Sequence, residues 1–183
     1  MFEHPVLAAF YHRHGPAPFP PNPFPERTLF QVLAESIVAQ QLSGKAAATL
    51  TARLWSHVPP EPLAVQALPL EALRRVGLSQ TKALALQDLA EKTRQGLLEG
   101  IQLLPDEEVK ARLLRVRGVG PWTAEMFLMF GLGRPDVWPV GDLGVQKAAQ
   151  RLFGVSKEDL SRFGEAFRPF RSHLAWYLWR SLE

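Results

Sequence analysis

The chain contains no cysteine among its 183 residues, and that absence excludes several kinds of site. Disulfides, zinc sites with thiolate ligands and iron–sulfur clusters all need cysteine sulfur. Long apolar runs are missing as well. No stretch reaches the roughly 18 residues that a membrane-spanning helix requires, and no basic segment followed by an apolar one begins the chain as a leader would. We therefore expect a cytoplasmic protein with no membrane partner.

The five histidines show no spacing that pairs them with a carboxylate in a metal site, so no side-chain metal site is expected. What the chain does contain is apolar material: 46% of its residues are hydrophobic, enough for one domain or two small lobes that share a core. The net charge of +3 is a modest basic excess that selects no partner by itself. Four basic residues form either part of a DNA-binding surface or a solvated helix face: Lys110, Arg112, Arg115 and Arg117.

Apolar positions recur at helical spacing along the chain, and no segment alternates as a strand would. Six prolines within residues 16–25 predict an extended connector in place of a helix. The fold class is therefore all-α. The predicted helices cover residues 5–14, 27–40, 45–55, 79–98, 123–132, 142–153 and 169–182, with one more from residue 106 and short pieces before residue 76. The residues expected to cap helices are Ser79, Asp106, Asp142 and the pair Ser156 and Asp159.

A glycine hairpin lies between two of the predicted helices. Residues 113–124 read Leu-Leu-Arg-Val-Arg-Gly-Val-Gly-Pro-Trp-Thr-Ala. Gly118 and Gly120 let the backbone turn sharply and approach a ligand closely. Pro121 suits the first turn of a helix, whose free amide groups bind anions. The segment is therefore either an ordinary corner between helices or a site that holds a DNA phosphate without reading a base.

An aspartate at the start of a predicted helix follows the hairpin. Asp142 stands 20 residues after Trp122, in the segment Val-Gly-Asp-Leu-Gly-Val at 140–145. Its place at the start of a predicted helix is typical of an N-cap. The same residue is also the candidate for chemistry, because no other acid or base motif lies near the hairpin, and the two roles are compatible.

Taken together, these residues resemble the helix-hairpin-helix DNA glycosylases, and among them the 3-methyladenine branch that acts on alkylated bases. The resemblance runs from about Pro5 to Trp179. It implies a single domain over residues 1–183, built as two helical lobes with a DNA-binding cleft between them and without an N-terminal β domain. The implied reaction is hydrolysis of the N-glycosidic bond of an alkylated purine that has been flipped out of duplex DNA. In that reaction Asp142 would stabilise positive charge on the sugar and orient or deprotonate the attacking water.

The resemblance also implies the residues of the base pocket. Trp122 stands where lyase members of the family place a lysine, so a glycosylase without lyase activity is expected. The segment Pro-Phe-Arg-Ser at 169–172 is similar to a family pattern that precedes a pocket tryptophan, and Trp179 matches that tryptophan. Met126 occupies a position where a related type of enzyme has a pocket tyrosine. Electron-rich rings suit a positively charged alkylated purine, although Trp122 and Trp179 also suit ordinary core packing.

Two further DNA contacts are implied. The segment Ser-Ile-Val-Ala-Gln-Gln-Leu-Ser-Gly-Lys at 36–45 is similar to the family's turn that enters the minor groove, with Gln41 or Leu42 as the wedge; a simple polar turn is the alternative. The phosphate would be held by Gly118, Val119, Gly120 and Thr123. No organic cofactor is implied. A monovalent cation, sodium or potassium, would be held by the backbone carbonyls of Leu114, Val116 and Val119.

The expected partner is double-stranded DNA that contains a damaged base, bound by a monomer of bacterial type at the nucleoid. Two other functions stay open. One is a non-catalytic DNA-binding helix-hairpin-helix module, and the other is a glycosylase for oxidised or mismatched bases. The sequence does not rank 3-methyladenine, 7-methylguanine, ethenoadenine and deaminated purines as substrates.

Overall fold

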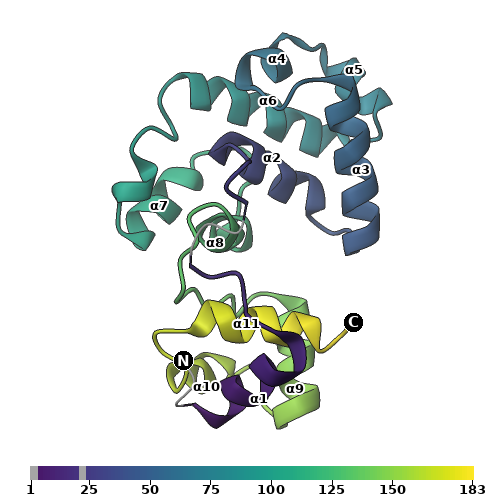
Figure 1. Ribbon diagram of the computed structural model, residues 1–183. Coiled ribbons are helices and arrows are strands. Elements are labelled where there is room, and N and C mark those ends of the chain that lie inside the picture. The colour runs from purple at the N-terminus through teal and green to yellow at the C-terminus, as the bar shows by residue number, and fades with distance from the viewer. Residues whose placement is uncertain (1–3, 21–23) are drawn as a thin grey trace. The chain divides into compact units, whose positions relative to one another are not determined.

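The computed structural model describes residues 4–20 and 24–183 of the chain, and across these ranges it contains helices and no strand. The all-α prediction is confirmed (Figure 1). None of the helices within the described ranges combines the length and apolar character needed to span a membrane. In chain order the helices are α1 (Pro5–His14), α2 (Leu29–Ala39), α3 (Gly44–His57), α4 (Pro62–Ala67), α5 (Leu70–Arg75), α6 (Gln80–Arg94), the 3₁₀ helix η1 (Ile101–Leu103), α7 (Asp106–Leu113), α8 (Pro121–Phe130), α9 (Leu143–Phe153), α10 (Leu160–Glu165) and α11 (Arg171–Arg180).

The chain divides into two compact units. Unit 1 comprises residues 1–23 and 128–183, and unit 2 comprises residues 24–127. Helix α8 begins in unit 2 and ends in unit 1. Part of the proline-rich connector, residues 21–23, lies outside the described residues.

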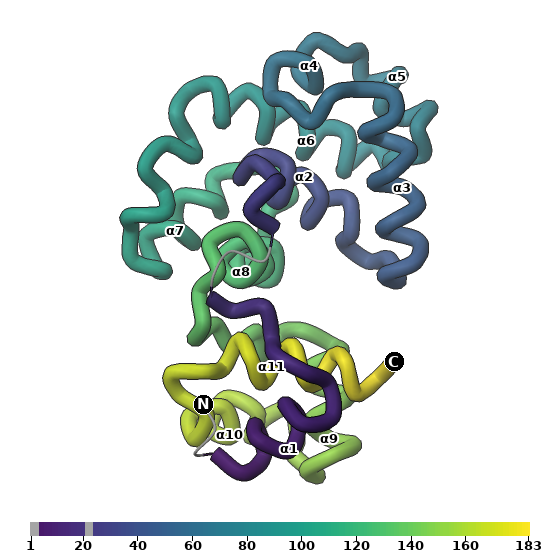
Figure 2. The backbone as a smooth tube through the Cα atoms, in the orientation of Figure 1, coloured from purple at the N-terminus to yellow at the C-terminus, as the bar shows by residue number. Residues whose placement is uncertain are grey.

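Unit 2 is built around α2, whose apolar residues are almost all buried. Helices α3 and α6 pack on α2, while α4 and α5 pack on α6 (Figure 2). The starts of these helices follow from the sequence, because hydroxyl side chains accept the first free amides. Thr28 accepts the Gln31 amide, and Ser79 accepts the Lys82 amide, as an N-cap should.

Unit 1 is built around α11, which packs against α1 and α9. Tyr177 of α11 is fully buried, and its ring stacks on that of Phe10 with centroids 5.5 Å apart. The indole of Trp138 donates to the Leu160 carbonyl at 2.9 Å. Gly164 makes this possible, because a Cβ atom there would lie 2.4 Å from the indole nitrogen. Unit 1 therefore has an aromatic core into which α11 presents one face.

Several predicted boundaries need correction. Helix α2 begins at Leu29 and not at residue 27, and α8 covers Pro121–Phe130 in place of residues 123–132. Helix α6 ends at Arg94 and not near residue 98, because Gly96 adopts a φ of +90° that interrupts the helix. Asp106 is the first residue of α7 and does not cap it; Pro105 holds the N-cap position, without a side-chain hydrogen bond. The last helix starts at Arg171, two residues later than predicted.

Candidate functional site

The hairpin, residues 114–120, joins α7 to α8 in unit 2. Gly118 has a φ of +73°, and a Cβ atom there would lie 3.2 Å from the Ala85 methyl, so this position requires glycine. A Cβ atom at Gly120 would meet nothing within 4 Å. Val116 and Val119 are buried, so the hairpin packs its valines inward and presents backbone at the start of α8. Free amides at a helix start are what a phosphate needs.

Two side chains hold the hairpin in place, Asp88 of α6 and Gln40, which directly follows α2. Asp88 accepts the Arg117 amide at 2.7 Å and also pairs with Lys92 at 2.6 Å. Burial by itself raises the pKa of Asp88, but the bonds from Arg117 and Lys92 outweigh it, and the net pKa lies below its ordinary value of 3.8. Gln40 donates from its side-chain amide to the Gly118 carbonyl and to the Thr123 hydroxyl, both at 2.9 Å. Gln40 and Asp88 were not predicted as site residues, because nothing in the sequence shows which hairpin atoms their side chains reach.

These contacts refine the predicted phosphate ligands. Thr123 is 2% exposed and its hydroxyl is bonded to Gln40, so a phosphate would meet its backbone amide and not its side chain. Two of the four basic residues near the hairpin make bonds within the protein. Lys110 pairs with Glu107, and Arg112 donates to the Glu99 carbonyl. Arg115 and Arg117 are exposed.

The groove turn, Gln40–Ser43, links α2 to α3 in unit 2. Gln41 has a φ of +59°, a conformation that a residue other than glycine rarely adopts. Both Gln41 and Leu42 are exposed, Leu42 by 39% although it is large and apolar. Non-glycine residues in the left-handed region often mark functional positions. The geometry is that of a turn which projects two side chains outward.

Asp142 lies in unit 1 as the N-cap of α9, as predicted. Its Oδ1 atom accepts the Val145 amide at 2.8 Å and the indole N–H of Trp179 at 2.8 Å. Gly144 makes room for this contact, because a Cβ atom there would lie 2.9 Å from the indole of Trp179 and 3.0 Å from Oδ1. The two bonds fix the orientation of the carboxylate. The second glycine of the Gly-Asp-Leu-Gly segment is therefore needed for the contact between Asp142 and Trp179.

Helix α11 also holds the loop that leads to Asp142. Arg171 binds the Asp136 carboxylate through two nitrogens at 2.8 and 2.9 Å. Ser172 accepts the Val137 amide at 2.9 Å and donates to the Arg134 carbonyl at 2.7 Å. The Pro-Phe-Arg-Ser segment therefore fixes one end of the loop, while Trp179, later on the same helix, fixes the other end at Asp142.

The three predicted pocket residues fall in different units. Trp122 is half-buried and Met126 is buried, and they lie four residues apart on α8, hence on one face of that helix in unit 2. Trp179 is half-buried in unit 1, beside Asp142 and near Phe130, whose ring centroid lies 6.0 Å from its own. The structure thus brings Trp179 to the catalytic candidate and places Trp122 and Met126 together.

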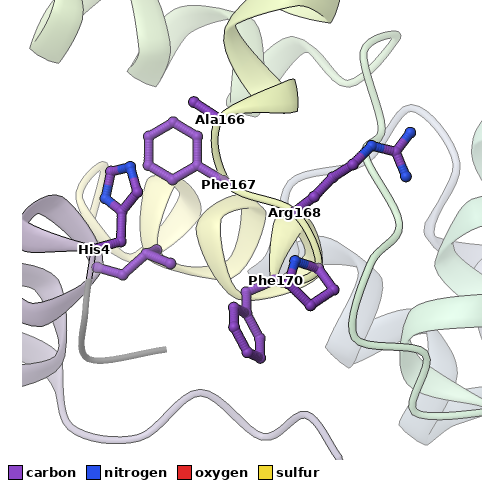
Figure 3. A pocket seen from close by; sticks show the side chains of 7 residues that line it. His4, Ala166, Phe167, Arg168 and Phe170 are labelled. Carbon is purple, nitrogen blue, oxygen red and sulfur yellow. The ribbon is translucent and has the colours of Figure 1, made fainter.

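Unit 1 also contains a cavity of about 320 Å³ that is separate from the predicted site residues. Figure 3 shows its lining side chains, with the imidazole of His4 against Phe167, their centroids 4.2 Å apart, and the guanidinium of Arg168 directed away from both. None of the predicted site residues lines it. Among the residues that the structure describes, no cluster of three histidine or carboxylate side chains suits a metal ion.

The carbonyls predicted to hold a cation belong to the hairpin. The Val116 carbonyl accepts the Val119 amide at 3.1 Å, which leaves its second lone pair for another partner. Carbonyl oxygens replace the hydration shell of monovalent cations in other proteins. The donor set of Leu114, Val116 and Val119 is therefore chemically suited to sodium or potassium.

Fold and site together define a helix-hairpin-helix protein with one capped, oriented carboxylate. Residues 34–169 match the model of the HhH-GPD superfamily of base excision DNA repair proteins. Since this match covers most of the chain, the chain belongs to that family.

Named relatives narrow the comparison. A putative DNA-3-methyladenine glycosylase of Bacillus subtilis is 31% identical over 97% of this chain and 66% of its own length. DNA-3-methyladenine glycosylase 1 of Schizosaccharomyces pombe is 33% identical over 83% of this chain and 72% of its own. The chain thus spans slightly less than two thirds of the first relative.

Solved structures of 3-methyladenine DNA glycosylases have the same fold as this chain. The 3-methyladenine DNA glycosylase of S. pombe in complex with abasic DNA superposes with a TM-score of 0.85 at 30% identity, over 96% of this chain and 88% of that one. The 3-methyladenine DNA glycosylase of Archaeoglobus fulgidus gives a TM-score of 0.82 at 27% identity, over 97% and 65%. The predicted family and branch are confirmed by these names.

Proposed function

We propose that this protein is a monofunctional DNA glycosylase that hydrolyses the N-glycosidic bond of alkylated purines in duplex DNA, as a step of base excision repair. It acts as a monomer on a duplex that contains a damaged base. The observation that carries the proposal is Asp142, held by the start of α9 and by Trp179 in a chain whose named relatives are 3-methyladenine glycosylases.

The main requirement of the reaction is a negatively charged group held close to the sugar. The bond between C1′ and the base nitrogen breaks, and its electrons leave with the base, so a positively charged alkylated purine departs neutral. Positive charge builds on the sugar, where a fixed carboxylate stabilises it. Water then adds to C1′, and Asp142 takes its proton. Because the two bonds to Oδ1 orient the carboxylate before the substrate arrives, little reorganisation is needed.

The remaining residues hold the DNA and select the base. The amides at Gly118, Gly120 and Thr123 bind a phosphate, whereas the Val119 amide already donates to the Val116 carbonyl within the hairpin. A sodium or potassium ion on the hairpin carbonyls would neutralise part of the phosphate charge. Trp179, whose indole N–H is bonded to Asp142, contacts the flipped base. A cationic purine on a tryptophan face gains about 0.5–2 kcal/mol, which a neutral base does not. No organic cofactor takes part.

The deciding experiment is Asp142→Asn on a panel of single-lesion duplexes. Asparagine is as good an N-cap as aspartate, so folding and duplex binding should stay near normal. Single-turnover excision should fall by about 10²–10⁴, the usual contribution of a general base. The control is Asp159→Asn, which removes a carboxylate bonded to Ser156 in an exposed turn. Wild-type excision by Asp142→Asn would contradict the mechanism, and no excision of any lesion by the wild type would favour a non-catalytic DNA-binding module.

Absence of a lyase step is a separate prediction. Trp122 stands where a Schiff base would need lysine, so the abasic product should leave unbroken. Borohydride added to enzyme and abasic DNA should trap no covalent adduct. A saturable adduct would show that another amine of this chain attacks the sugar, and the proposal would then be limited to base excision.

A further inference from the structure

Gln40 is the last residue before the exposed part of the groove turn, and its side chain leaves the turn to meet the hairpin. Its amide nitrogen has two hydrogens, and both are used: one bond goes to the Gly118 carbonyl and one to the Thr123 hydroxyl, each 2.9 Å long. The Gly118 carbonyl only accepts, which settles that the nitrogen and not the oxygen of the Gln40 amide faces the hairpin. These partners lie 78 and 83 residues further along the chain.

The backbone of the groove turn is held from its other side by Lys82 of α6. Its ammonium group donates to the carbonyls of Val38 and Gln40, both at 2.7 Å. Carbonyls at the end of a helix have no partner within that helix, and here a lysine supplies one. Burial lowers the pKa of Lys82. The turn is therefore held at Gln40 by two groups, Lys82 on the backbone and the hairpin on the side chain.

The groove turn has two exposed residues next to Gln40. Gln41 and Leu42 both present side-chain surface to solvent, and Gln41 is in the left-handed conformation. The position of these two side chains relative to the hairpin depends on Gln40 and Lys82. Since the backbone of Gln40 belongs to the turn and its side chain bonds the hairpin, it is a residue that relates one to the other.

We propose that Gln40 is a positioning residue that couples the groove turn to the phosphate-binding hairpin, so that both meet the duplex as one rigid piece. The proposal rests on the proposed function. A phosphate held on the hairpin then fixes the register of the turn, and the turn fills the space left by the flipped base at the correct step. Without the coupling, the phosphate is still bound, but the turn enters the duplex less often in the productive position.

The primary variant is Gln40→Met, which keeps the length and volume of the side chain and removes both donors. The matched control is Gln87→Met. Gln87 donates to the Leu68 carbonyl at 2.9 Å, a bond of the same kind within unit 2 that touches neither the hairpin nor the groove turn. A second variant, Thr123→Val, removes one of the two acceptors at constant volume and keeps the test available if Gln40→Met folds poorly. Single-turnover excision should fall about tenfold in Gln40→Met, less in Thr123→Val and under twofold in Gln87→Met.

A double-mutant cycle separates coupling from general loosening. The turn variant Gln41→Ala/Leu42→Ala is measured alone and combined with Gln40→Met. If Gln40 acts through the turn, the turn variant should slow excision much less in the Gln40→Met background than in the wild type. Binding of undamaged duplex should change less than twofold, which a merely structural defect in the hairpin would not allow.

The outcomes are decisive in both directions. Independent, multiplicative effects of Gln40→Met and the turn variant would overturn the coupling, as would equal behaviour of Gln40→Met and Gln87→Met or a turn variant without effect. A second readout needs no excision: the fluorescence of 2-aminopurine opposite an abasic-site analogue reports opening of the duplex, and it should rise on binding of wild type and much less with Gln40→Met. If the wild type excises no lesion but this difference is seen, the proposed function fails and the coupling stands.

Discussion

At the scale of single residues, Gly144 determines how closely Trp179 approaches Asp142. A hydrogen bond to a charged group contributes about 1.5–3 kcal/mol, which makes the indole donor a substantial influence on the carboxylate. The bond exists only because the residue two positions after Asp142 has no side chain. Trp179 was predicted as a wall of the base pocket, and the structure adds that its N–H faces Asp142.

This arrangement leads to a prediction for Gly144→Ala. The new methyl would lie 2.9 Å from the Trp179 ring, so the indole must move away from Oδ1 although both chemical groups remain. Excision should slow about 10- to 100-fold, in line with the loss of a bond worth about 1.5–3 kcal/mol. Alanine is favoured over glycine in a helix by about 1 kcal/mol, which offsets part of the strain, so the melting temperature should change less than the rate.

The control for Gly144→Ala is Gly141→Ala, on the other side of Asp142. A Cβ atom at Gly141 would meet nothing within 4 Å, so this variant should keep wild-type excision. Equal single-turnover rates for Gly144→Ala and the wild type would mean that the indole bond does not govern the carboxylate.

At the scale of elements, residues that start or stop helices made several helices predictable. Helix α1 lies between Pro5 and Gly15, and α9 lies between Asp142 and Gly154, as the capping residues indicate. Helix α6 was predicted too long, since apolar residues continue in register past its end and Leu97 is buried by the following turn instead. Periodicity therefore identified which residues are buried more reliably than where a helix stops.

What the sequence did not reveal are side-chain bonds between distant segments. Asp88 meets the Arg117 amide across 29 residues, Gln40 meets Gly118 across 78, and Trp179 meets Asp142 across 37. Asp88 and Trp179 stand on helices and Gln40 directly follows one, and only the packing of the helices decides what each side chain faces. The residues of the hairpin and of the groove turn were predictable, whereas the residues that hold them were not.

The hairpin itself is tested by Gly120→Asp. The position precedes α8 and is open, and its carbonyl accepts the Ala124 amide, so aspartate there suits a helix start and should leave stability unchanged or slightly raised. A negative charge at the phosphate site should nevertheless weaken duplex binding. The loss should be equal for damaged and undamaged duplexes in a filter-binding or anisotropy assay, because phosphate contacts carry no base information.

Gly120→Ala supplies the steric control for that experiment. It adds a methyl group into open space without charge and should bind DNA almost as the wild type does. A loss confined to damaged DNA in Gly120→Asp would place the hairpin in the base pocket and contradict its role as a phosphate site.

At the scale of the whole molecule, the two units contribute different parts of the proposed reaction. Unit 2 contains the hairpin and the groove turn, and unit 1 contains Asp142 with the aromatic helix α11. Helix α8 starts at the hairpin and continues into unit 1, so one helix belongs to both. Base opening and bond cleavage are therefore assigned to separate units of a single chain.

This division predicts that the two steps can be separated by the choice of duplex. Opening a paired base costs a few kcal/mol, and a mismatch reduces that cost. Gln41→Ala/Leu42→Ala, which removes the side chains proposed to fill the vacated space, should slow excision by roughly tenfold or more in a matched duplex and by much less in a mismatched one.

Asp142→Asn supplies the comparison, because it acts on bond cleavage after the base has been opened. Its defect should be the same in matched and mismatched duplexes, and single-turnover rates for the two variants on both duplexes measure the contrast. Equal slowing of the turn variant in both duplexes would mean that the turn has misfolded, and no slowing in either would remove Gln41 and Leu42 from the mechanism. A mismatch that rescued Asp142→Asn as well would show that the carboxylate acts before or during opening, and the assignment of cleavage to unit 1 would then be wrong.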